Sequence, residues 1–74
     1  MHHTEITDKM VCAAVQEYQA NRDNFPYEIL AKRTGKPENL CYKAMIRAER
    51  RELIEYGVSL RTGWLTEKGI GLLG

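Results

Sequence analysis

The chain has 74 residues, of which 43% are hydrophobic and 28% are charged, and its formal net charge is +1. This composition is typical of a folded globular protein and excludes a disordered tail, and the length allows one domain, residues 1–74. No apolar run approaches the length of a membrane-spanning helix, and the N-terminus lacks the basic and apolar segments of a signal peptide. We therefore expect a cytoplasmic protein.

A first helix is expected at about residues 8–20. Thr7 can cap its N-terminus, and Asp8 supplies an anion in the first turn, where the helix dipole favours one. Apolar residues recur at helical spacing from Ile6 to Tyr18, which predicts one buried face. A cluster of polar residues then ends the helix.

A second helix is expected at about residues 26–34 and a third at about 37–51. Proline is tolerated at a first helical position, which suits Pro26, and Gly35 can end the second helix in the left-handed conformation. Pro37 is expected to begin the third helix after a turn of about three residues, a length typical of a helix-turn-helix.

The third helix has two different faces when its residues are placed about 100° apart. One face is small and apolar and is expected to be buried: Pro37, Cys41, Ala44 and Ala48, with Leu40 and Met45 beside it. The opposite face is polar and cationic: Asn39, Tyr42, Lys43, Ile46 and Arg50, with Arg47 and Glu49 at its edges. Amide, phenol, ammonium and guanidinium groups are those that reach bases and phosphates.

A β-hairpin is expected at about residues 53–65. The two ends of this segment are β-prone, and Gly57 and Gly63 bracket the stretch that places Arg61 near the tip. Thr66 can then cap a short last helix at about residues 67–73. The predicted fold is mainly α with a small β-hairpin.

Positive charge is concentrated in the middle of the chain. Residues 32–51 hold seven of the eleven basic side chains and two of the ten acidic ones. Such an asymmetry is expected when one face meets phosphate groups and the other faces avoid them. The alternative interpretation is a solvated helix face with incidental lysines and arginines.

No catalytic, metal or cofactor site is expected. Cys12 and Cys41 fall at apolar helix positions, where free thiols behave as small hydrophobic groups. Zinc binding by His2, His3 and Cys12 is rejected because the spacing matches no familiar site. Residues 69–74 match the dinucleotide-binding pattern G-x-G-x-x-G only as letters, because no helix follows them. The chain is therefore not expected to be an enzyme.

Several short motifs between residues 26 and 70 follow one known pattern. They are Leu30-Ala31 followed by Gly35, then Leu53-Ile54 after the third helix, then Leu65-Thr66-Glu67-Lys68-Gly69. These motifs resemble the winged helix-turn-helix fold: a three-helix core, a two-stranded wing and a short C-terminal helix. The likeness is to the DNA-reading part of bacterial transcriptional repressors of the multiple-antibiotic-resistance type, as in small phage or plasmid regulators.

Two residues depart from the family's pattern. Lys36 stands where an apolar residue usually follows the turn glycine, and Glu52 stands where a glycine usually ends the third helix. The turn and the start of the first strand are therefore expected to differ locally. The long dimerisation helices of the full-length repressors are also absent from these residues.

The resemblance implies binding of double-stranded DNA, with the third helix in the major groove, and a role in transcriptional regulation. It implies base contacts from Asn39, Tyr42, Lys43, Ile46 and Arg47. It implies phosphate contacts from Lys32, Arg33, Lys36, Arg50, Arg51 and Arg61. Ile46 suits either a thymine methyl group or a protein contact. A homodimer or a protein partner is expected, because one recognition helix reads only a few base pairs.

The second hypothesis is a protein-interaction module, for example a phage accessory protein. Winged helices also serve as scaffolds for protein binding, and a fold does not determine a function. Tyr42, Ile46 and Tyr56 would then form a mixed aromatic and apolar patch with arginine neighbours, a composition typical of interface hot spots.

Overall fold

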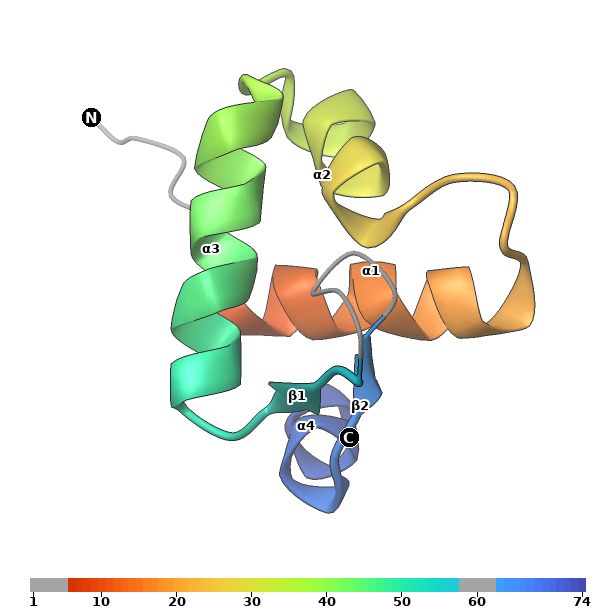
Figure 1. Cartoon of the computed structure of the whole chain (residues 1–74), viewed down its shortest axis with the longest axis vertical. Coiled ribbons are helices and arrows are strands. Elements are labelled where there is room, and N and C mark those ends of the chain that lie inside the picture. Colours follow the sequence, from red (N-terminus) through yellow and green to blue (C-terminus); the bar gives the residue numbers. More distant parts are fainter. Residues whose placement is uncertain (1–5, 58–62) are drawn as a thin grey trace.

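The computed structural model describes residues 6–57 and 63–74. Within these ranges four helices and a two-stranded antiparallel sheet are present (Figure 1). The elements are α1 (Asp8–Ala20), α2 (Pro26–Thr34), α3 (Glu38–Arg50), β1 (Ile54–Glu55), β2 (Trp64–Leu65) and α4 (Glu67–Leu73). The expectation of a mainly helical chain with a small antiparallel pair of strands is confirmed. The positions expected for Arg61, His2 and His3 lie outside the described residues.

No helix in the described ranges has both the length and the apolar character needed to cross a membrane.

The start of α1 depends on a local cap. The side-chain oxygen of Thr7 accepts a hydrogen bond from the Met10 N–H at 3.2 Å, so the helix begins at Asp8. Figure 1 shows α1 lying across the lower part of α3, and it contacts α2, α3, α4 and β2. The buried face of α1 therefore forms the centre of the core, which also includes residues of α2, α3 and both strands.

The two core thiols are inert components of this packing. Cys12 on α1 and Cys41 on α3 are free and fully buried. Burial raises the pKa of both thiols, and the nearby Asp8 carboxylate raises the pKa of Cys12 further. Both cysteines therefore stay protonated near neutral pH and pack as small apolar groups.

The turn between α2 and α3 is three residues long. Gly35 has the left-handed backbone conformation with φ 72°, and its N–H donates to the Ala31 carbonyl oxygen at 2.9 Å. Pro37 is extended, with φ −60° and ψ 149°, and serves as the N-cap residue. The third helix therefore begins at Glu38 and not, as expected, at Pro37, and it ends at Arg50.

The first turn of α3 is less buried than expected. Pro37 is exposed, and Leu40 is 43% exposed, although both were placed on the buried face. The reason is the position of α1, which crosses the C-terminal half of α3 and leaves the first turn uncovered on that side (Figure 1). The burial expected for the rest of that face is confirmed: Cys41, Ala44, Met45 and Ala48.

The C-terminus of α3 has the geometry of a Schellman motif. The Leu53 N–H donates to the Ala48 carbonyl oxygen at 3.0 Å, and the Glu52 N–H donates to the Glu49 carbonyl oxygen at 2.9 Å. Glu52 occupies the left-handed position with φ 65°, the conformation that glycine adopts without strain. The helix therefore ends in a conformation that suits glycine, with glutamate in that position.

Replacing Glu52 with glycine is expected to raise the free energy of unfolding by about 0.5 to 1 kcal/mol. Glycine removes the contact between Cβ and the carbonyl oxygen, and the larger entropy of the unfolded glycine chain offsets part of the gain. Urea unfolding measures the change. The control is Glu52→Ala, which loses the carboxylate but keeps the strain; an equal gain in both variants would contradict the backbone explanation.

The two strands join the end of α3 to α4. Ile54 pairs with Leu65 and Glu55 pairs with Trp64, so the first pair faces the core and the second faces solvent. The Thr66 hydroxyl accepts a hydrogen bond from the Gly69 N–H at 3.1 Å and begins α4. Gly69 is buried against the backbone of Leu53, which fixes α4 beneath the sheet.

Candidate functional site

The side of α3 that points away from the core is polar and cationic. Asn39, Lys43 and Arg50 are exposed on this side, and Ile46 between them is half-buried and packs against the edge of the core. We call these four residues the outer face of α3. Lys43 and Arg50 are about two helical turns apart along α3, and Asn39 lies about one turn before Lys43.

Tyr42 lies at the edge of the outer face and contributes to helix packing. Its ring meets the ring of Tyr27 on α2 edge-on, with the ring centroids 6.1 Å apart. The Tyr27 ring in turn stacks on Phe25, whose ring approaches that of Tyr18, each pair at 6.0 Å between centroids. The half-buried Tyr42 ring therefore helps to hold α3 against α2.

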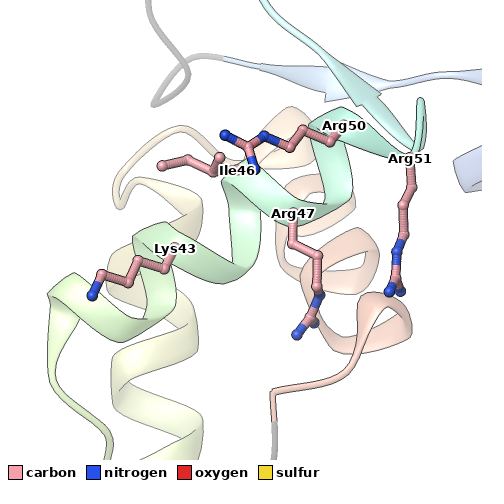
Figure 2. Close-up of a pocket in the computed structure, with 5 residues that line it drawn as sticks. All are labelled: Lys43, Ile46, Arg47, Arg50 and Arg51. Carbon is pink, nitrogen blue, oxygen red and sulfur yellow. The ribbon is translucent and has the colours of Figure 1, made fainter.

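Arg47 and Arg51 extend toward the start of α1, whereas Lys43, Ile46 and Arg50 extend from the other side of the helix (Figure 2). The Arg47 Nε donates to Asp8 Oδ1 at 2.9 Å, and Arg51 donates to Asp8 Oδ2. Arg47 also donates to the backbone oxygen of Ile6. We call Asp8, Arg47 and Arg51 the Asp8 cluster. It joins the start of α1 to the C-terminal half of α3.

The charges of the Asp8 cluster keep its carboxyl group ionised. Burial by itself raises the pKa of Asp8, but the hydrogen bonds and positive charges of Arg51 and Arg47 outweigh burial and hold the pKa below its ordinary value. The Asp8 side chain is only 17% exposed, so solvent weakens these interactions less than at a fully exposed pair.

Replacing Asp8 with asparagine is expected to lower the free energy of unfolding at pH 7 by about 1 to 2 kcal/mol, because the two guanidinium groups lose their anion. The folded-state pKa is depressed, so this stabilisation is present above the ordinary aspartate pKa of about 3.9 and is lost as the pH falls through the folded value. Urea unfolding between pH 7 and pH 2 measures both effects.

The matched control for that variant is Asp23→Asn, which removes an exposed carboxylate from the turn after α1. It is expected to leave stability nearly unchanged. If Asp8→Asn and Asp23→Asn gave the same stability at every pH, the Asp8 cluster would not contribute to the fold.

One shallow depression collects five of the residues singled out in the sequence. Its volume is about 380 Å³, and its lining residues are Lys43, Ile46, Arg47, Arg50 and Arg51. Four of the lining residues are cationic, and two of them, Arg47 and Arg51, are paired with Asp8, so the depression has a net positive charge. An apolar side chain among cations suits a ligand that presents both negative charge and apolar edges.

Three other cations expected to bind phosphate, Lys32, Arg33 and Lys36, do not line this depression. Lys32 is exposed on α2, and Lys36 is half-buried in the turn before α3. Arg33 forms an ion pair with Glu17, which ties α2 to α1. Arg61 falls in a stretch for which no position is described. Among the described residues, the structure therefore brings together the cations of α3 and Arg51 at its C-terminal end.

The pairing of Asp8 with α3 is the feature that the sequence did not indicate. Asp8 was expected to act only as an anion in the first turn of its own helix. Its two partners are 39 and 43 residues away in the chain, a separation at which no local spacing signals a contact.

Comparison of the chain with protein-family models, with curated proteins and with solved structures finds no match. Function is therefore inferred from the chain's own residues.

Proposed function

We propose that this chain binds double-stranded DNA as a winged helix-turn-helix domain, with α3 in the major groove, and that it regulates transcription. The observation that carries the proposal is the outer face of α3, where Asn39, Lys43 and Arg50 are exposed along one side of a rigid helix. An α-helix fits the major groove, and amide and cationic side chains are the groups that read base edges and phosphates there.

Each residue of the outer face has a specific role in this proposal. Asn39 pairs with adenine, Lys43 donates to guanine, and Ile46 contacts a thymine methyl group. Arg50 neutralises a phosphate and sets the orientation of the helix. Arg47, which the resemblance assigned to base reading, is held by Asp8 and Ile6; in the proposal it and Arg51 form a fixed cationic edge beside the groove.

The distribution of carboxylates supports a single orientation on DNA. Glu49, Glu52, Glu55 and Glu67 line one depression at the end of the molecule that holds the sheet and α4. None of them lines the cationic depression on α3. These carboxylates repel DNA phosphates, which disfavours binding of DNA at that end of the molecule. The cations of α3 attract phosphates.

A second candidate function is binding of another protein, as in an interaction module built on the same scaffold. It is favoured by two aromatic side chains at the sheet, Tyr56 and Trp64, which are exposed. Aromatic residues of this kind are common in interface hot spots.

Selection from a random pool of DNA duplexes tests the first proposal against the second. We expect the chain to retain duplexes at low salt and to release them as salt increases. We also expect the selection to enrich a short sequence motif that contains adenine, guanine and thymine. Failure to retain any duplex at low salt would overturn DNA binding, and retention without an enriched motif would overturn base reading.

A further inference from the structure

Two depressions of opposite charge meet at Lys68 of α4. One is acidic and is lined by Glu49, Glu52, Glu55 and Glu67 together with Ile54, Thr66 and Lys68. The other is mainly basic and is lined by Lys9, Arg51 and Lys68 together with Thr7, Asp8, Leu53 and Leu72. Lys68 lines both depressions, so they form one continuous surface, which we call the α4 surface.

The helix that carries Lys68 also exposes apolar side chains. Ile70 is 56% exposed and Leu72 is 41% exposed. A Cβ added at Gly71, between them, would have nothing within 4 Å, whereas Gly69 faces the core. Exposed apolar side chains beside an open helix position leave room for another element to approach closely.

We infer that the α4 surface binds a second copy of this chain in a two-fold symmetric dimer. In such an interface the same patch is used twice, so the patch must be self-complementary: where one residue contacts a second residue of the other copy, the reverse contact also forms. A two-fold axis near Glu67 and Lys68 sets the acidic depression of each copy against the basic depression of the other. Close to the axis, Glu67 of each copy meets Lys68 of the other copy.

Charge is the reason for choosing a second copy as the occupant. A partner segment of one sign would match one depression and be repelled by the other, whereas a second copy matches both at once. The symmetric arrangement also covers Ile70 and Leu72, which are exposed to water in a single copy. Removing these apolar side chains from water favours the dimer.

The dimer leaves the outer face of α3 accessible in both copies, whereas Arg51 of the cationic edge also lines the α4 surface. None of the outer-face residues, Asn39, Lys43, Ile46 and Arg50, lines either depression of the α4 surface. Figure 1 shows α4 at the end of the molecule opposite α2 and the first turn of α3. If the proposed function holds, two recognition helices then read two half-sites, which lengthens the DNA sequence recognised.

Analytical ultracentrifugation of the chain without DNA tests the dimer, so its outcome is independent of DNA binding. We expect a monomer–dimer equilibrium whose dissociation constant rises as the salt concentration increases. Glu67→Lys and Lys68→Glu are each expected to raise the dissociation constant of the dimer by about tenfold or more, because each creates two like-charge contacts. The double variant E67K/K68E again sets opposite charges against each other across the axis. Its dissociation constant is expected to return to within about threefold of the unaltered chain's value.

Further variants separate the interface from effects on folding. The Lys68 Nζ donates to the Arg51 carbonyl oxygen at 3.4 Å, so circular dichroism and thermal unfolding are recorded for every variant. Ile70→Asp is expected to abolish dimerisation without unfolding the chain, because its side chain is already more than half exposed. Leu40→Asp, an exposed leucine outside the α4 surface, is expected to leave dimerisation unchanged.

A chain that stays monomeric up to about millimolar concentration would overturn the inference, since that limit excludes even a weak dimer. So would a dimer whose dissociation constant is indifferent to both charge reversals and to Ile70→Asp.

Discussion

Replacing Gly69 with alanine is expected to lower the free energy of unfolding by about 1 to 3 kcal/mol. A Cβ at this position would lie 2.2 Å from the Leu53 carbonyl oxygen and 3.1 Å from Leu65 Cδ2. The carbonyl cannot move aside freely, because it accepts the Thr66 N–H at 3.1 Å and the Leu53 N–H is bonded to Ala48. Relief of the clash would therefore require α4 to shift away from the sheet.

The chain contains a matched control for this prediction. Gly71 lies in the same helix, and a Cβ there meets nothing within 4 Å. Gly71→Ala is therefore expected to preserve stability or raise it by up to about 1 kcal/mol, because alanine favours the helix. Thermal and urea unfolding of the two variants provide the comparison. Equal stability of the two would contradict the close packing of α4 against Leu53.

On the duplex enriched by selection, Asn39→Ala and Lys43→Ala are each expected to weaken binding by about 1 to 3 kcal/mol, with a much smaller loss on other duplexes. Arg50→Ala is expected to weaken binding to all duplexes alike and to reduce the slope of log K against log salt by about one phosphate contact. The difference arises because base edges carry sequence information and phosphates do not.

Fluorescence anisotropy titrations at several salt concentrations measure these changes. Arg22→Ala is the matched control, since it removes an exposed cation that lies over the Tyr18 ring, 5.4 Å from its centroid, in the turn after α1. It is expected to alter binding little. Identical losses for all four variants on every duplex would contradict the separation into base-reading and phosphate-binding residues.

Sequence reasoning was most successful at the ends of the helices. Thr7 and Thr66 cap the helices that follow them, and Gly35 ends α2 in the left-handed conformation. These signals work because a cap acts through hydrogen bonds to backbone groups three or four residues away. The departure noted at Glu52 also corresponds to a real feature, because this residue occupies a position that favours glycine.

The candidate site was only partly predictable for a different reason. Periodicity placed Asn39, Lys43 and Arg50 on one side of a helix, and they are exposed there. Periodicity could not tell that Leu40 would stay uncovered, or that Arg47 would be bonded to Asp8. Both outcomes depend on where α1 crosses α3, which no residue of α3 specifies by itself.

The sequence alone therefore determined which segments become helices and which side of each helix is apolar, because those properties arise from neighbours within a few residues. Only the tertiary structure decided which cations remain available on α3 and how closely α4 approaches Leu53. It also decided that acidic and basic depressions share one surface around Lys68. Those features join residues far apart in the chain, so they exist only once the helices have packed against one another.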